Sequence, residues 1–171
     1  MKRFVLLLGV LFLVLTSGCG YRIGSLMHPQ IKTVAVAPVG NDTLMYNLSP
    51  QLRNMLIESF QSDGSLKVVQ ESQADCIVYA KVTSVSFNEI AWSESDKKND
   101  TFLPNEWGVR LSASVAVMIP GRAAPLLAER TITGSATFTS GPDLEASRTY
   151  AVRQACYDAA KKMVIQLTEA W

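Results

Sequence analysis

Histidine is almost absent from this sequence of 171 residues, and the single His28 lies beside Pro29 near the N-terminus. A Ser-His-Asp or Cys-His arrangement therefore cannot be assembled in the body of the chain. The sequence also lacks a glycine motif for phosphate, a calcium-loop spacing, and clustered Cys and His residues with zinc-ligand spacing. These absences predict that the protein is not an enzyme and has no cofactor and no metal.

Long runs of positive charge are missing as well. The chain has 16 Lys and Arg residues against 15 Asp and Glu residues, and no run of Lys or Arg is longer than two. This balance gives no reason to expect a nucleic-acid partner. An anionic ligand would have to be bound by local charge, because the chain has no strong overall field.

Cysteine is scarce, with three residues in the chain: Cys19, Cys76 and Cys156. Cys76 and Cys156 could close a loop of about 80 residues, which chain-entropy estimates value at roughly 4 kcal/mol. The alternative is two separate buried thiols that act as small apolar side chains. We favour the separate thiols, because each cysteine sits inside a periodic apolar pattern.

One uninterrupted apolar segment, residues 4–15, follows the positive pair Lys2 and Arg3. A helix of that length is far shorter than the ~30 Å hydrocarbon core of a membrane. A charged start, a short apolar segment and small residues after it are typical of a secretory signal peptide. Residues 1–18 are therefore predicted to be removed, which leaves about 150 residues, enough for one domain.

The residues before Cys19 indicate a lipid anchor. Thr16, Ser17 and Gly18 precede this cysteine, and the segment resembles the lipobox of bacterial lipoproteins, although Thr16 replaces the usual Leu. The resemblance implies that Cys19 carries lipid, including palmitate, and that residues 19–30 form a tether to the membrane. Two or three acyl chains hold a protein stably to a membrane. Gly20, rather than Asp, follows the cysteine, which favours the outer membrane by the enterobacterial rule.

Residues 31–171 are predicted to form a single domain that begins with a strand at 32–37, ended by Pro38. Apolar residues at intervals of three and four then predict a helix with Ser49 as N-cap, Pro50 in first position, and an end at Gly64. A short strand follows at 66–69.

Three long strands are predicted at 75–89, 107–119 and 126–139. The odd-numbered residues from Ile77 to Phe87 are expected on one face of the first of these. Residues 92–106 are polar and are predicted to be a long mobile loop and a candidate contact for a partner. A final helix at 144–169, capped by Asp143, has alanines at every fourth position that would allow it to lie close to a sheet.

The order β-α-β-β-β-β-α predicts an α+β two-layer sandwich. Its sheet would have about four to five strands, mixed but largely antiparallel, with both helices packed on one face. The other face carries Ser and Thr rows with Lys or Arg between them. Such a face is most often simply solvated, but a ligand or a pore wall could also rest on it.

The chain resembles the LptE-type lipopolysaccharide-assembly lipoproteins over most of the mature domain. The resemblance rests on the order of short motifs, namely Cys19-Gly20-Tyr21, then Pro29, Ile31, Lys32, Thr33, Val34 and Val36, then Pro38, Asn41, a helix from Ser49, Ala74-Asp75, and Val78 to Val85. It implies a two-helix, four-stranded sandwich. It also implies a plug and assembly partner of an LptD-type β-barrel in lipopolysaccharide export, at the periplasmic face of the outer membrane.

Basic residues on the sheet would contact lipopolysaccharide in such a protein. By position alone the candidates are Lys81, Arg110 and Arg130, because a cation on a strand could meet a lipid A phosphate. A charged residue at such a position is more often an ordinary surface charge. The alternative function is a general envelope lipoprotein that faces the periplasm and binds a different protein complex. A lipid carrier is disfavoured, because the mature chain has no long apolar run to enclose an acyl chain.

Overall fold

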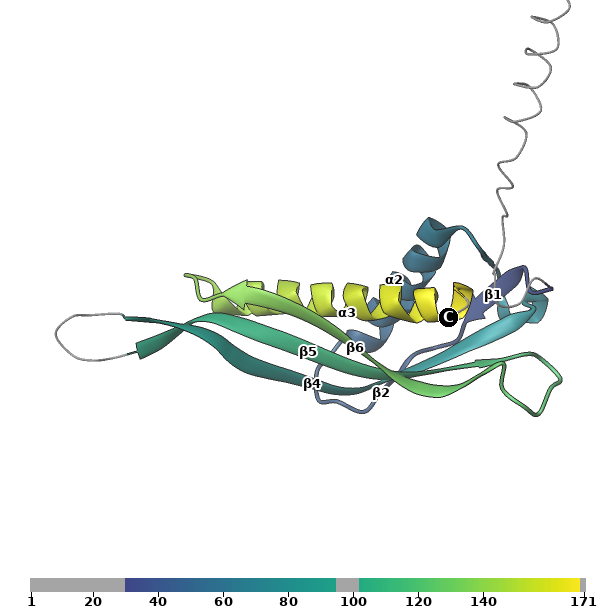
Figure 1. Cartoon of the computed structure of the whole chain (residues 1–171), viewed down its shortest axis with the longest axis horizontal. Coiled ribbons are helices and arrows are strands. Elements are labelled where there is room, and N and C mark those ends of the chain that lie inside the picture. The colour runs from purple at the N-terminus through teal and green to yellow at the C-terminus, as the bar shows by residue number, and fades with distance from the viewer. Residues whose placement is uncertain (1–29, 95–101, 170–171) are drawn as a thin grey trace, which may run out of the picture.

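A twisted sheet covered on one face by two helices makes up the protein, as predicted (Figure 1). The computed structural model describes residues 30–94 and 102–169. The strands are β1 (Thr33–Val36), β2 (Gly40–Asn41), β3 (Lys67–Val68), β4 (Cys76–Glu94), β5 (Phe102–Met118) and β6 (Leu127–Thr139). The helices are α2 (Leu48–Asp63), the short 3-10 helix η2 (Glu71–Gln73) and α3 (Leu144–Thr168).

The sheet is mixed, with strand order β3-β1-β4-β5-β6, and β2 pairs with β4 beyond β1. Pairing is parallel for β1 with β3 and β4, and for β2 with β4. Pairing is antiparallel for β4 with β5 and for β5 with β6. The two longest strands, β4 and β5, therefore form a hairpin that extends past the rest of the sheet (Figure 1).

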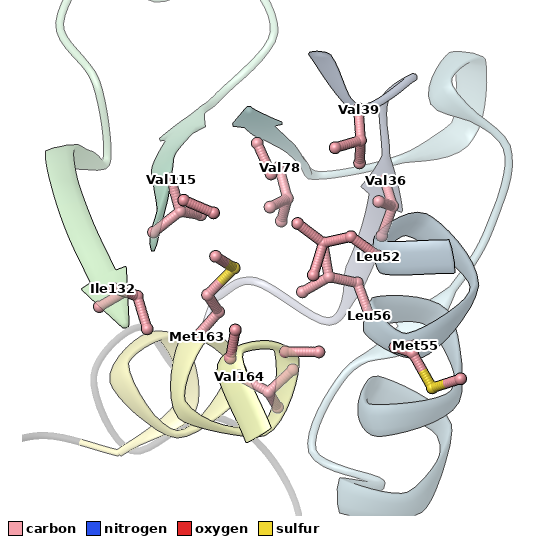
Figure 2. Close-up of a cluster of buried hydrophobic side chains, with 14 of the residues drawn as sticks. Val36, Val39, Leu52, Met55, Leu56, Val78, Val115, Ile132, Met163 and Val164 are labelled. Carbon is pink, nitrogen blue, oxygen red and sulfur yellow. The ribbon is translucent and has the colours of Figure 1, made fainter. Parts of the chain in front are cut away.

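The hydrophobic core lies between this sheet and the two helices. Figure 2 shows Leu52 and Leu56 of α2 and Met163 of α3 meeting Val78 and Val115 of the sheet. All five are buried. Fully burying a side chain of this size is worth about 1.5–3 kcal/mol relative to leaving it exposed, so this layer supplies much of the driving force for folding.

The alanine face of α3 lies directly on the sheet, as its spacing predicted. Ala151, Ala155 and Ala159 are buried, and a β-carbon added to Gly134 of β6 would be 2.6 Å from the backbone nitrogen of Ala159. Small residues on the helix and glycine on the strand therefore bring the two backbones together. Asp143 caps the helix as predicted, since its Oδ1 accepts a hydrogen bond of 2.9 Å from the Ala146 amide.

The start of α2 differs from the prediction. The helix begins at Leu48, and Asn47, rather than Ser49, is its N-cap, with a left-handed φ of 61°. Asparagine tolerates this conformation better than most residues. The predicted end is confirmed, because Gly64 has a φ of 72° and its amide bonds to the Phe60 carbonyl.

The prediction that the odd-numbered residues from Ile77 to Phe87 share one face is wrong. The register shifts between Val82 and Ser84, so Val85 and Phe87 pair with the buried Leu111 and Val109 on the helix side. A β-bulge of this kind reverses the alternation of faces, and a count of periodicity does not reveal it.

The predicted long loop at 92–106 is shorter than expected. Strand β4 continues to Glu94 and β5 starts at Phe102, so pairing of the two strands occupies both ends of the segment. Residues 95–101 lie outside the described part of the chain. The short strand β2 and the short helix η2 were not predicted, because segments of two or three residues have no periodicity to detect.

Both domain cysteines are buried and unpaired, which confirms the favoured alternative. Burial raises the pKa of each thiol to about 11, and for Cys76 the negative charge of Asp75 adds a smaller effect. The Sγ atom of Cys76 also lies 3.7 Å from the Thr33 carbonyl oxygen.

Candidate functional site

The sheet face opposite the helices is the first candidate surface. On β5 this face carries the half-buried Ser112 and the buried Ser114, and on β6 it carries the exposed Thr131 and Ser135. Tyr79 of β4 is half exposed on the same face. The predicted small, polar face is therefore present, and it is open to a partner or ligand over the central strands.

Lys81 lies on this open face, opposite Ser114. Its Nζ atom is 2.8 Å from Oδ2 of Asp42, which follows β2. This hydrogen bond and the charge of Asp42 raise the pKa of Lys81 above its ordinary value. Lys81 therefore has an anionic partner, and part of its charge is already matched by Asp42.

Arg110 lies on the same open face, between Ser86 of β4 and Ser135 of β6. It is exposed, and none of the ion pairs among the described residues includes it. Arg110 is four residues from Ser114 on β5, so it lies about 13 Å from Lys81 along the strand direction. The two cations can therefore meet two separate anionic groups of one large ligand.

Arg130 does not join these two residues. It pairs with Val115, which is buried on the helix side. Arg130 therefore belongs to the helix side of the edge strand β6, opposite the open face. The expected trio of cations is therefore split between two faces by the register of β6, and a ligand on the open face would not reach all three directly.

Residues 42–47 form an ordered loop that sequence reasoning did not single out. The Asn41 side chain organises it: Oδ1 accepts hydrogen bonds from the amide and hydroxyl of Thr43, and Nδ2 donates to the Met45 carbonyl at 2.8 Å. On this loop Leu44 and Tyr46 are 98% and 91% exposed. An ordered loop that displays two large apolar side chains is a candidate contact with a partner.

The motifs Lys32-Thr33 and Ala74-Asp75, which carry part of the family resemblance, meet at Asp75. Its Oδ2 atom accepts hydrogen bonds of 2.9 Å from the amides of Lys32 and Thr33, and the Asp75 amide donates to the Thr33 hydroxyl at 2.9 Å. These bonds hold the pKa of Asp75 below its ordinary value, with the Lys32 amide contributing most. The role of Asp75 is therefore to fix the start of β1 against β4.

Two concave regions lie on the helix side. A cavity of about 250 Å³ is lined by Phe87, Trp107, Phe138, Leu144, Glu145 and Arg148. There the Arg148 guanidinium carbon is 4.3 Å from the centre of the Phe87 ring, and the Trp107 and Phe138 rings stack with centres 6.5 Å apart. A second, more polar hollow of about 370 Å³ lies between the helices, beside Met55, Glu58, Tyr150, Arg153 and Tyr157.

Within the described residues, no group of three or more His, Cys, Asp and Glu side chains is placed to hold a metal ion. The helices of this same part of the chain are each too short or too polar to cross a bilayer. Cys19 and its lipobox residues Thr16, Ser17 and Gly18 lie outside the described ranges. The described residues form three candidate contact surfaces: an open polar face, an apolar loop and an aromatic pocket.

Comparison with known proteins gives one family match. The family model for LptE, described as lipopolysaccharide-assembly, matches residues 31–168. No match was found among curated proteins.

Solved structures give similarity of fold. A minor lipoprotein of Acinetobacter baumannii has 12% identity and a TM-score of 0.52, with 81% of this chain and 93% of that chain covered. A hypothetical protein of Chlamydia trachomatis also has 12% identity and a TM-score of 0.52, with 81% and 96% covered. The PelC dodecamer of Paraburkholderia phytofirmans has 12% identity and a TM-score of 0.51, with 81% and 90% covered.

Proposed function

Because the chain belongs to the LptE lipopolysaccharide-assembly family, we propose that it is a lipid-anchored outer-membrane protein that works with an LptD-type β-barrel in lipopolysaccharide export. The observation that carries this proposal is the extent of the family match, which runs from Ile31 to Thr168, the last residue of α3. Every described helix and strand of the domain therefore falls within the matched segment.

The anchor of this protein is Cys19. A charged start, an apolar segment at 4–15 and small residues before the cysteine fit removal of residues 1–18 and lipid attachment to the thiol. More than one acyl chain on this residue would hold the domain at the membrane. The domain would then lie on the periplasmic side, attached through residues 19–30.

The role of the domain is binding and assembly rather than catalysis. Leu44 and Tyr46 are presented by a loop that the Asn41 side chain keeps in shape, so docking them costs little ordering of the backbone. The open sheet face offers Lys81 and Arg110 to anionic groups such as the phosphates of lipid A. Arg130 would make any such contact separately, from the other side of the sheet.

A general envelope lipoprotein that binds a different complex is the second candidate. The exposed pair Leu44 and Tyr46 supports docking to a protein without specifying a β-barrel. A fold shared at 12% identity with the PelC dodecamer adds nothing to the choice of partner, because a shared fold does not imply a shared function.

The deciding experiment is purification of a tagged, lipidated copy from membranes in mild detergent, with the co-purifying proteins identified by mass spectrometry. A stoichiometric LptD-type barrel is the expected result. A Leu44→Ser, Tyr46→Ser variant should retain less of it, whereas Tyr150→Ser changes an exposed aromatic residue elsewhere, on α3, and is the control. Recovery of another envelope complex without a barrel would favour the second candidate.

A further inference from the structure

One side of β4 has no neighbouring strand over much of its length. On that side β1 pairs at Cys76–Val78 and β2 pairs at Lys81–Val82. The last backbone bond there is from the Asp42 amide to the Val82 carbonyl, at 2.9 Å. Among the described residues, no strand lies beside β4 on this side from Ser84 onward.

The direction of the unpaired groups follows from the register. The amide of Ser135 points away from β5, because it donates to Asp158 of α3. Its partner Arg110 must then direct its backbone groups to β4, which makes Ser86 and Arg110 a hydrogen-bonded pair. By alternation along β4, the amides and carbonyls of Val85 and Phe87 point to the open side, and those of Glu89 continue the same register.

The outer edge of β6 and the open stretch of β4 differ in whether side chains bind their backbone groups. At β6, Asp158 accepts from the Ser135 amide at 2.9 Å, and Lys162 donates to the Thr133 carbonyl at 3.1 Å, so α3 occupies the outward backbone groups. A covered edge cannot add another strand. No such side chain covers the open stretch of β4 among the described residues, and residues 84–88 carry no charge. Register shifts beyond Val82 and Glu89 delimit this stretch to about six residues.

An apolar pocket lies beside the same stretch. Phe87 lines the cavity of about 250 Å³ together with Trp107, Phe138, Leu144 and the Glu145–Arg148 pair of α3. In strand addition, backbone bonds supply affinity and pockets for alternate side chains supply specificity. The open edge of β4 and this pocket provide both parts.

We propose that the edge of β4 from Ser84 to Glu89 binds an extended segment of the partner barrel protein by strand addition, with an apolar side chain of that segment in the pocket beside Phe87. This inference rests on the proposed function, because it names the barrel as the partner. A second copy fits less well: on the helix side Val85 and Phe87 already pack against their own core, which leaves only the acidic Glu89 to enter the apolar pocket.

The first test measures amide exchange in the full lipidated chain, alone and co-purified with the LptD-type barrel of the same genome. In the chain alone, the amides of Ser84, Ser86 and Asn88 should be protected by β5, and those of Val85, Phe87 and Glu89 should exchange freely. In the complex the second set should become protected as well. Exchange at Val85, Phe87 and Glu89 that is the same with and without the barrel would overturn the inference.

The second test compares Glu89→Pro with Glu89→Ala. Proline removes the outward amide of residue 89 and keeps the bonds to β5, whereas alanine removes only the side chain. Loss of one backbone bond and crowding by the ring should lower barrel recovery about tenfold for proline and leave it unchanged for alanine. Equal recovery of the barrel with both variants, folded as judged by their unfolding midpoints, would contradict strand addition while the proposed function stood.

Two other outcomes separate failure of the proposed function from failure of this inference alone. If wild type recovers no barrel, the proposed function fails and this inference fails with it. If the exchange pattern appears in the chain without the barrel and depends on protein concentration, the edge pairs with a second copy, and the inference is wrong while the function is untouched. Should Glu89→Pro fail to fold, the exchange pattern of the wild-type complex decides.

Discussion

Gly134 of β6 lies directly under Ala155 of α3, so close that a β-carbon at position 134 would overlap the Ala155 carbonyl oxygen. The obstacle is backbone on the helix, which cannot rotate out of the way as a side chain can. The contact holds α3 over the edge strand, where Asp158 and Lys162 bind the outward backbone groups of β6. The absence of one side chain thus allows the helix to cover that edge.

Gly134→Ala should therefore destabilise the domain strongly. Overpacking of a tight contact costs about 1–3 kcal/mol, and here the helix backbone would have to move. Urea unfolding followed by circular dichroism measures the change. Gly141→Ala is the matched control, because nothing lies within 4 Å of a β-carbon there. An equal effect of the two substitutions would refute the close contact of helix and strand.

Asp75→Asn should lower stability at neutral pH and lose its effect in acid. The folded-state pKa of Asp75 lies below the ordinary value of 3.8, because the amides of Lys32 and Thr33 bond to the carboxylate. Its contribution is therefore present above that ordinary value and is lost as the pH falls through the folded-state pKa. Urea midpoints of wild type and variant should differ at pH 7 and converge toward pH 3.

The control for Asp75 is Glu71→Gln, an exposed acid in η2 for which no such bonds exist among the described residues. Its midpoint should follow that of wild type at both pH values. A constant difference between wild type and Asp75→Asn from pH 7 to pH 3 would argue against a charge-dependent role.

Cys76 and Cys156 should not react with thiol reagents in the folded protein. Burial raises both pKa values to about 11, so little thiolate is present at pH 8, and access is blocked as well. Titration with a chromogenic disulfide should find both thiols only after unfolding in urea. Rapid reaction of either thiol under native conditions would show that the core opens locally.

Arg110→Ala should weaken binding of lipopolysaccharide to the purified domain by about tenfold, since a hydrogen bond to a charged group contributes about 1.5–3 kcal/mol. Lys81→Ala should have a smaller effect, because Asp42 already matches part of its charge. Arg130→Ala, alone and combined with Arg110→Ala, tests the opposite face. Arg122→Ala, in the turn after β5, is the control; unchanged binding for a variant removes that residue from the site.

Cys19→Ser should release the protein from the membrane. Without a thiol no diacylglyceryl group can be attached. The variant should therefore take up no labelled palmitate, and membrane fractionation should not find it with the outer membrane. Cys156→Ser provides a comparison, because that thiol lies in the core and should retain both labelling and location. Membrane retention of Cys19→Ser would contradict the anchor.

The sequence by itself determined the elements in which a residue pattern repeats many times or an end is marked by a capping residue. The alanine spacing of 151–159 and the Asp143 cap predicted α3, and the alternation of β5 predicted a half-buried strand, because each signal repeats within one element. The mixed sheet with two helices on one face followed from their order. Short motifs at Lys32-Thr33 and Ala74-Asp75 supported the family, although the bonds between them could not be anticipated.

Only the tertiary structure decided how these elements are placed against each other. The register of β6 separates Arg130 from Lys81 and Arg110, and the bulge after Val82 places Val85 and Phe87 on the helix side. Pairing between strands sets both. The loop that carries Leu44 and Tyr46 is held by the Asn41 side chain, a local bond without periodicity. The open edge of β4 exists because β2 ends at Asn41 while β4 continues to Glu94, a difference in length between strands far apart in the chain.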